Sequence, residues 1–481
     1  MNKRRDNLVE LLYYGYTTIK NQIIPISGCI ISFIGSDNKF APYIRMLFYA
    51  LMAWICIYSF LKWYNRYFKF GDNIISISEG VFTKRSIDVP YSSVKSINTS
   101  ASLIKRIVGV SDFSLELIGG DKIIFVLRNT QINELRNQLF SGIHQTKTSQ
   151  ANVQKLKPLQ YFLISLTNFP TFIAALSIAF SIYGFIFQTY GKRLVADADK
   201  DPRSTIEILA ALKLDDILNL NFLMVMGLFL GVIVTVAYFI SFFFIYLTYG
   251  RFSTTNAEND ITVEYGIINK KVYHIPKSQI RSLRIGEPLL FRIFGYAQLK
   301  IDNIGLTEGR SSLVLLHPAV KKEVAEKIIA SYIPAFKEQT ISLRPEKNVI
   351  FSYILSNIIS PIVTFIVLYF ISPKLGFMFI FTPLYLLYGY AEWRHSGLSF
   401  DDKVLSLQYT KRLRKTTLIT LKKFVETTET SQTVFMKKKE IYHYVFAVYS
   451  EDQTEEYVCR FLSNSSKQHF LKYLVEKRST N

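Results

Sequence analysis

Four long apolar runs constrain this chain more than any other feature of its sequence. Residues 159–187, 222–247 and 349–371 contain no charged side chain, and residues 42–61 contain only Arg45. A helix rises about 1.5 Å per residue, so about 20 apolar residues cross the roughly 30 Å of hydrocarbon in a bilayer. The four runs therefore predict transmembrane helices.

Two shorter runs extend this pattern to pairs. Residues 23–34 are short for a span, and residues 375–390 follow a Ser372-Pro373-Lys374 turn, so the latter are either a short span or a re-entrant segment. With both included, the sequence predicts about six transmembrane helices in three pairs. The segments between the pairs are expected outside the bilayer, because 20% of all residues are charged.

The net charge of +20 is explained by the membrane and does not require a nucleic-acid partner. If the N-terminus lies in the cytoplasm, few basic residues fall outside, and acidic residues nearly balance them there. Basic residues concentrate on the cytoplasmic side of membrane proteins. We therefore expect both termini in the cytoplasm, residues 188–221 as the one sizeable external loop, and no nucleic acid.

Two segments of the chain, 186 residues apart, align with each other without a gap. Such self-similarity indicates a repeated structural unit. The matched pairs include Gly80 and Gly266, Lys84 and Lys270, Pro90 and Pro276, Arg106 and Arg292, and Gly109 and Gly295.

Each copy has the pattern of a small β-rich domain closed by a helix. Residues 74–78 and 261–264 alternate apolar and polar side chains, which is typical of a strand with one buried face. The glycines that follow, Gly80 and Gly266, indicate a tight turn. Residues 131–142 and 319–331 then show helical spacing of apolar residues.

The chain from residue 398 onward repeats the strand pattern and ends in a predicted closing helix at 465–477, but it lacks the glycine and proline positions. We interpret it as a third, diverged copy. The predicted regions are an N-terminal segment with the first helix pair (1–66), domain 1 (67–150), the second helix pair with the external loop (151–250), domain 2 (251–338), the third helix pair (339–394) and domain 3 (395–481).

The order strand, Gly, basic pair, Pro and Arg-Ile-Val/Phe-Gly resembles the bacterial pleckstrin-homology-like (PH-like) membrane proteins of the YdbS/YdbT type. The arrangement of three such domains is most similar to the YdbT branch, over nearly the whole chain. This resemblance implies an α+β membrane protein in which each helix pair precedes a cytoplasmic, bent β-barrel capped by a C-terminal helix. It also implies a multi-pass location in a bacterial plasma membrane.

No catalytic, cofactor or metal site is predicted. The six histidines are isolated along the chain, and no HExxH, P-loop or GxSxG motif occurs. The three cysteines form no CxxC pair. We therefore expect that the chain is not an enzyme.

Two groups of residues are candidates for ligand binding. The motif arginines either bind a phosphate or donate to backbone carbonyls at a bend between strands. Basic turn residues are candidates for anionic-lipid contact, because each can add about 1 kcal/mol of attraction near an anionic leaflet. The motif residues are Gly80, Pro90, Arg106, Gly109, Gly266, Pro276, Arg292 and Gly295, and the basic residues are Lys84, Arg85, Lys270, Lys271, Lys411, Arg412, Arg414 and Lys415.

Two functions compete at this point. The first hypothesis is a non-enzymatic scaffold or sensor at the inner leaflet, acting in envelope stress or defence, whose partners are membrane lipids, another membrane protein or a second copy of itself. The alternative is a transporter-like device for a lipid or an amphipathic peptide, which requires a continuous polar path between the helix pairs. A membrane enzyme is a third possibility and requires a cluster of ionisable side chains.

Overall fold

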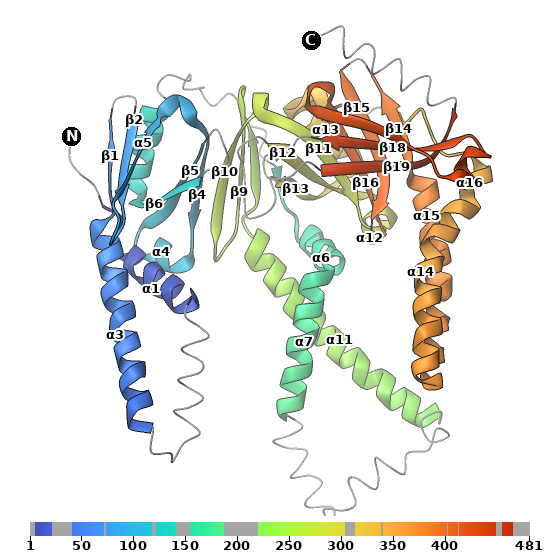
Figure 1. Ribbon diagram of the computed structural model, residues 1–481, viewed down its shortest axis with the longest axis horizontal. Coiled ribbons are helices and arrows are strands. Elements are labelled where there is room, and N and C mark those ends of the chain that lie inside the picture. The colour runs from blue at the N-terminus through green and yellow to red at the C-terminus, as the bar shows by residue number, and fades with distance from the viewer. Residues whose placement is uncertain are drawn as a thin grey trace, which may run out of the picture.

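A computed structural model of the chain shows three β-rich domains in a row, with the long apolar helices extending from one side of the row (Figure 1). Residues 23–34, 188–219 and 465–477, which contain one predicted helix, most of the predicted external loop and the predicted closing helix, lie outside the described part. The structure describes residues 5–21, 41–71, 74–117, 122–140, 154–186, 220–303, 313–337, 340–401, 403–411, 413–448 and 455–464.

Domain 1 contains two groups of three antiparallel strands followed by a helix. Two helices, α1 (Val9–Asn21) and α3 (Ala41–Asn65), precede it. Its elements are β1 (Tyr67–Phe70), β2 (Ile74–Glu79), β3 (Arg85–Pro90), the 3-10 helix η1 (Tyr91–Ser93), β4 (Val94–Ala101), α4 (Leu103–Ile107), β5 (Val110–Leu117), β6 (Lys122–Arg128) and α5 (Asn129–Phe140).

Domain 2 repeats this order after α6 (Pro158–Thr167), α7 (Phe169–Ile186) and α11 (Leu220–Tyr249). A short strand, β7 (Gln154–Lys155), precedes α6 and pairs with β8. The elements of domain 2 are β8 (Ser253–Asn256), β9 (Asp260–Tyr265), β10 (Lys270–Pro276), η3 (Lys277–Gln279), β11 (Ile280–Glu287), α12 (Leu289–Ile293), β12 (Tyr296–Asn303), β13 (Leu313–Lys321), α13 (Lys322–Tyr332) and η4 (Pro334–Phe336).

Domain 3 has the same strand order after η5 (Lys347–Val349), α14 (Ile350–Ile371), η6 (Pro373–Phe381) and α15 (Thr382–His395). Its described elements are β14 (Gly397–Phe400), β15 (Val404–Lys411), β16 (Arg414–Leu421), η7 (Lys422–Phe424), β17 (Val425–Ser431), α16 (Val434–Lys437), β18 (Ile441–Val448) and β19 (Glu455–Ser463).

Each domain has its own apolar core between its two groups of strands. In β9 the side chains of Ile261 and Val263 are fully buried, while the alternating residues Thr262 and Glu264 are half-buried. This is the alternation that the sequence predicts, because successive side chains of a strand point to opposite faces. Phe68 and Phe125 occupy the corresponding core of domain 1, with ring centroids 4.8 Å apart.

The domains are joined through their sheets. Strand β4 of domain 1 pairs antiparallel with β10 of domain 2, which gives a seven-stranded sheet, and β11 of domain 2 pairs with β16 of domain 3 in a six-stranded sheet. Hydrogen bonds of a β-ladder thus cross both domain boundaries. In the described part of the chain the row contains four sheets, and the two larger ones each span a domain boundary.

Two motif glycines lie in the turn that follows the second strand of domains 1 and 2. Gly80 (φ 126°) follows β2 and Gly266 (φ 104°) follows β9. A Cβ atom on Gly80 would lie 1.9 Å from the Thr83 carbonyl oxygen, so no larger residue fits this turn. In domain 3 the hairpin is tighter, because Lys411 pairs directly with Arg414, and Leu413 takes the positive φ of 61°.

Fewer membrane-spanning helices are found than the six expected. Among the described residues three helices are long and apolar enough to cross a bilayer, and a bent pair gives a fourth if it counts as one span. The bent pair, 158–167 and 170–179, turns by 82° at Asn168, where α6 ends, because Pro170 in the first turn of α7 has no N–H to continue the hydrogen bonds of α6. The three spans lie at Met46–Asn65, Gly231–Tyr249 and Lys347–Ile371.

The predicted run 375–390 is not a continuous α-helix. Its first half belongs to the 3-10 helix η6, and α15 begins only at Thr382, with Pro383 in its first turn. A 3-10 helix is rarely long, so this segment is a weak candidate for a full span.

Candidate functional site

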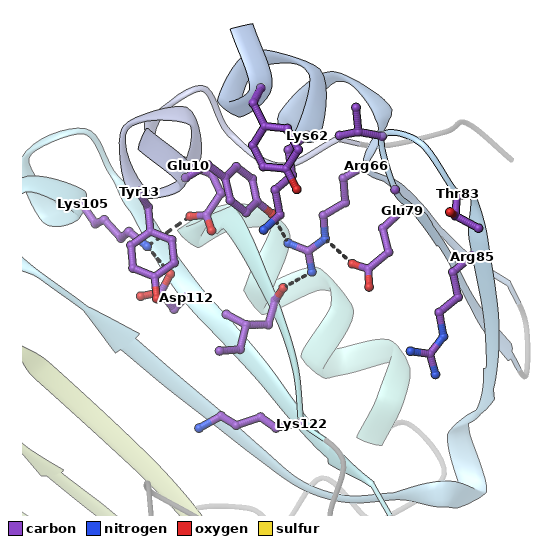
Figure 2. A pocket seen from close by; sticks show the side chains of 15 residues that line it. Glu10, Tyr13, Lys62, Arg66, Glu79, Thr83, Arg85, Lys105, Asp112 and Lys122 are labelled. Carbon is purple, nitrogen blue, oxygen red and sulfur yellow. Dashed lines mark hydrogen bonds and ion pairs between the residues drawn. The ribbon is translucent and has the colours of Figure 1, made fainter. Parts of the chain in front are cut away.

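A charged cavity lies where the first helices meet domain 1 (Figure 2). Its volume is about 540 Å³, and its walls come from α1, the last turns of α3, the β2–β3 turn and the strands β5 and β6. Five of the lining residues are basic and three are acidic. The lining residues are Glu10, Tyr13, Tyr14, Tyr58, Lys62, Arg66, Glu79, Gly80, Val81, Thr83, Arg85, Lys105, Asp112, Lys122 and Ile124.

Arg66, immediately after α3, organises one side of the cavity. Its guanidinium donates to the Asp6 carboxylate at 2.8 Å, to the Tyr14 hydroxyl at 2.9 Å and to the backbone carbonyl of Ile124 at 2.6 Å, and it lies 3.4 Å from Glu79. Burial raises the pKa of Asp6 above its ordinary value, although Arg66 pulls it down. The five-donor guanidinium therefore ties both helices to the sheet.

Lys105, on α4, organises the other side. Its ammonium group lies 3.5 Å from the Glu10 carboxylate and forms a close ion pair with Asp112 (Figure 2). Burial raises the pKa of Glu10 to about 7, against the attraction of Lys105. Glu10 thus gains and loses its proton near neutral pH.

The remaining bases of the cavity are less engaged in ion pairs. Lys62 lies over the Tyr14 ring at 4.9 Å, Lys122 is 4.0 Å from Glu116, and Arg85 is exposed. Because bases outnumber acids in the lining, the cavity favours an anionic ligand. Within the described part of the chain no group of three potential metal-ligating side chains occurs.

The corresponding place in domain 2 is filled. By the 186-residue offset Arg66 and Glu79 correspond to Phe252 and Tyr265, which stack with ring centroids 6.3 Å apart. The β9–β10 turn also closes on α11, because the Ile267 amide donates to the Leu247 carbonyl at 2.9 Å.

Gly250 makes this closure possible. Its place in domain 1 is taken by Tyr64, and a Cβ atom on Gly250 would lie 2.4 Å from the Ile267 side chain. In domain 1 the corresponding turn therefore leaves the cavity open.

The two motif arginines, Arg106 and Arg292, make different contacts and do not form a shared site. Arg106 donates to the Ile267 carbonyl of domain 2 at 2.6 Å, so it bridges two domains. Arg292 lies on α12. Burial lowers the pKa of His395, and the positive charge of Arg292 lowers it further. Gly109 and Gly295 have φ of 75° and 70°, and Pro90 and Pro276 end β3 and β10.

The equivalent of this motif in domain 3 could not be recognised from the sequence. After β17 the short helix α16 ends in Lys437, where domains 1 and 2 have arginine, and Glu440 has the positive φ of 51° that Gly109 and Gly295 have elsewhere. The only available signal was the position of a short apolar-basic segment between two strands.

The predicted lipid-contact residues fall into two groups. Lys84, Arg85 and Lys411 are exposed. Three others contact a neighbouring strand or domain: Lys270 lies 2.5 Å from Glu264, Lys415 lies 3.5 Å from Glu287, and Arg414 donates to Gln298 at 3.1 Å. Lys271 is half-buried in β10, and Arg412 lies outside the described residues.

All three domains turn the same rim toward the helices. The first strand of each domain starts at a helix end and the second strand returns toward it, so the turn that follows the second strand lies beside the helices (Figure 1). Large apolar side chains are exposed there, which is the signature of an interaction surface. They are Phe82 (80% exposed), Ile107 (77%), Ile268 (38%), Ile293 (67%) and Leu413 (47%).

Two polar residues beside or within the apolar helices, Asn168 and Asn357, have local hydrogen-bond partners. Asn168 ends α6, and Asn357 donates to the Tyr353 carbonyl and, at 2.6 Å, to Glu392 of α15. Glu392, which also lies 3.6 Å from Arg460, was not predicted, because it lies beyond the end of the apolar run 375–390. Asp6, Glu10 and Arg66 were missed too, although an acidic pair spaced four residues apart beside an apolar helix was visible.

Two comparisons with known proteins agree with this architecture. The family model described as bacterial PH domain matches residues 23–142 and 206–335, together more than half of the chain. The UPF0699 transmembrane protein YdbT of Bacillus subtilis (strain 168) is 22% identical over 486 residues, covering 96% of this chain and 95% of the relative. No solved structure matches. Nothing in these matches points to transport.

Proposed function

This chain belongs to the bacterial PH domain family, and from this premise we propose that it is a non-enzymatic membrane scaffold whose row of domains lies on an anionic bilayer surface and binds phospholipid head groups. In this proposal the chain is a multi-pass protein of the bacterial plasma membrane. Both termini and all three domains face the cytoplasm, where basic residues are retained.

The observation that carries the proposal is the shared rim. Phe82, Ile268 and Leu413 occupy the corresponding turn of each domain, all beside the helices and all exposed. Exposed bases accompany them, namely Lys84 and Arg85 in domain 1 and Lys411 in domain 3. In membrane-surface contacts, apolar side chains enter the head-group region of the bilayer and neighbouring basic side chains contact anionic head groups.

The rim contributes only a modest binding energy, and the membrane-spanning helices add to it by keeping the rim close to the bilayer. Full burial of one such apolar side chain contributes about 1.5–3 kcal/mol, and each base near the surface about 1 kcal/mol. The helices already hold the domains at the membrane, so even a small intrinsic affinity keeps the rim in place.

The domain 1 cavity supplies the most specific head-group site in this proposal. Lys62 and Arg66 sit at the end of α3, where a transmembrane helix leaves the hydrocarbon, and Arg85 and Lys122 face them from the sheet. A phosphate placed there meets several donors from different elements. Charge-assisted hydrogen bonds of this kind are about twice as strong as neutral ones.

A depth measurement tests the proposal. Single cysteines replace Ile268 on the rim or Glu258, which is exposed on the β8–β9 turn at the far side of the same domain, in a chain without its native cysteines. Each carries an environment-sensitive fluorophore, and the full chain sits in nanodiscs with or without anionic lipid. We expect a blue shift and quenching by brominated lipid at position 268 only, stronger with anionic lipid; equal spectra at both positions would refute the rim as the contact surface.

A further inference from the structure

The two boundaries between domains have the same register. At the first, Thr99, the sixth residue of β4, pairs with Val272, which lies five residues before η3. At the second, Ile285, the sixth residue of β11, pairs with Thr417, five residues before η7. Each domain therefore offers one edge to the previous domain and the opposite edge to the next, by one repeated geometry.

The ends of the row present the two halves of a third such boundary. Among the described residues β3 pairs only with β2, and β17 pairs only with β18. β3 holds the place in domain 1 that β10 and β16 hold in domains 2 and 3, and β17 holds the place of β4 and β11. Both strands are largely exposed, and an exposed strand edge is a template for another chain.

We propose that copies of this chain associate head to tail in the membrane, with β17 of one copy pairing antiparallel with β3 of the next. The repeated register places Thr430, the sixth residue of β17, opposite Ser86, five residues before η1. This β17–β3 pair joins a sheet of one chain to a sheet of the next, as the pairs at the two domain boundaries do within the chain.

Charge at the two edges fits this pairing. β17 carries Glu426 and Glu429 and no basic residue, while β3 begins at Arg85, directly after Lys84. In the repeated register Glu429 lies opposite Ile87, so Arg85 is its diagonal neighbour on the same face. Diagonal neighbours are about 7–8 Å apart, within reach of long charged side chains.

A side-chain contact at the first boundary also has its counterpart. There Arg106 donates to the Ile267 carbonyl of the following domain. Lys437, at the position of Arg106 in domain 3, is exposed. In the proposed joint it faces the β2–β3 turn of the next copy, where Val81 corresponds to Ile267.

The membrane is compatible with this assembly. Both existing boundaries keep the long helices on one side of the row (Figure 1), so repeating the same joint places the helices of the next chain on that side too. The contact is heterologous, since different surfaces of each copy meet. Such contacts produce closed rings or open filaments.

Disulfide trapping in native membranes tests the proposal on the full chain. The test chain carries Thr430→Cys and Ser86→Cys, with its native cysteines replaced. Residues directly opposite in an antiparallel pair have Cβ atoms about 4.5–5.5 Å apart, close enough for oxidation to join them. We expect a ladder of dimers, trimers and larger species whose masses are multiples of the chain.

Three controls make the result decisive. Thr99→Cys with Val272→Cys has the same register within one chain and should form an internal disulfide, which shows that this geometry can be trapped. Val458→Cys on the opposite edge strand, combined with Ser86→Cys, should give no ladder. Chains with Thr430→Cys alone or Ser86→Cys alone should dimerise only when they are co-expressed.

The charge complementarity is tested in the same assay. Glu429→Arg should reduce the yield of the ladder several-fold, and Arg85→Glu in the same chain should restore it. The proposal is overturned if the internal control forms while the 430–86 pair gives no ladder. It is equally overturned if Thr430→Cys joins to itself, or if the products have masses that include a different protein.

Discussion

Domains 1 and 2 share one backbone plan but differ at the joint between helix and sheet. In domain 1 the joint is an open cavity around the charged pair Arg66 and Glu79, whereas in domain 2 the aromatic pair Phe252 and Tyr265 fills the same place. Duplicated strands and turns therefore fix the fold. The few residues at the helix end decide whether a domain keeps a polar site or closes it.

Stability alone does not require the polar version of this contact. Taking charged groups out of water costs several kcal/mol per ion, and an apolar replacement of similar volume is often as stable or more so. Domain 2 shows that this fold accepts such a replacement. The retention of Arg66, Asp6 and Lys105 in domain 1 is thus better explained by a ligand than by stability.

Removal of Arg66 should have the largest effect on stability and tests the difference between the two domains most directly. Arg66→Ala leaves the buried Asp6 without its partner, and the free energy of unfolding of domain 1 should fall by about 3–5 kcal/mol. Hydrogen exchange of β5 and β6 in the nanodisc-embedded chain measures this loss. Arg66→Met with Asp6→Leu should recover most of it; if the double variant is as unstable as the single one, the account of the charge pair is wrong.

The two domains should respond to pH in opposite directions. Burial raises the pKa of Glu10 in domain 1 from 4.5 to about 7 and lowers that of His317 in domain 2 from 6.5 to about 4. Between pH 4.5 and 7 folded domain 1 holds a proton that its unfolded chain has released, so its stability falls as pH rises. Unfolded domain 2 binds a proton between pH 4 and 6.5 that the folded form lacks, so its stability rises.

Each of these groups contributes at most about 3 kcal/mol, at about 1.4 kcal/mol per pH unit. Hydrogen exchange of β5–β6 and of β12–β13, corrected for its intrinsic pH dependence, reads both domains in one sample. Glu10→Gln should reduce the slope of domain 1 alone, leaving the part that the raised pKa of Asp6 contributes at lower pH, and His317→Gln should reduce that of domain 2 alone. Parallel slopes in the two domains would contradict the assignment.

A tyrosine at position 250 should force domain 2 toward the open joint of domain 1. In Gly250→Tyr the new Cβ atom would lie 2.4 Å from the Ile267 side chain and 2.5 Å from the Tyr246 carbonyl oxygen, so we expect the end of α11 to shift and its contact with the β9–β10 turn to loosen. Overpacking of this kind costs about 1–3 kcal/mol. Faster exchange of the Ile267 amide with little change in β12 is the expected result, and Tyr64→Gly in domain 1 is the matched reverse substitution.

Charge reversal of the exposed pair should have the smallest effect on stability. Lys84→Glu with Arg85→Glu changes exposed sites, where substitutions stay within about 0.5 kcal/mol. The same change at Lys270 and Lys271 affects residues engaged in strand pairs and should cost more. In anionic nanodiscs the fluorescence of a probe at Phe82 should shift to the red for the first variant, and an unchanged spectrum would separate these bases from the lipid contact.

The strands of domains 1 and 2 were predictable because alternating burial is encoded locally, as in Ile261 and Val263. The repeat also identified the turn glycines correctly. Pairing between domains was not predictable, because β4 and β10 are far apart in sequence and their register depends on tertiary contacts. Fewer spans than predicted are found among the described residues, since apolar length alone reveals neither the break at Asn168 nor the 3-10 segment that interrupts the run 375–390.

The candidate site was predictable only in part. Gly80 and Arg85 of the cavity wall were among the motif and basic residues, but Glu10, Arg66 and Lys105 come from three separate segments that only the fold brings together. Domain 3 lost its sequence signature because Glu440 takes over a left-handed position that glycine holds in the other two domains.

The central claim is that the open joint of domain 1 binds an anionic head group and the closed joint of domain 2 does not. Photo-crosslinking of the full chain in membranes with an anionic phospholipid that carries a reactive group in its head, followed by peptide mass spectrometry, measures this directly. We expect labelling of residues 58–66 and 79–85 several-fold above that of residues 244–252 and 265–271, with competition by unlabelled anionic but not zwitterionic lipid. Equal labelling of the two joints, or none at domain 1, would contradict the account.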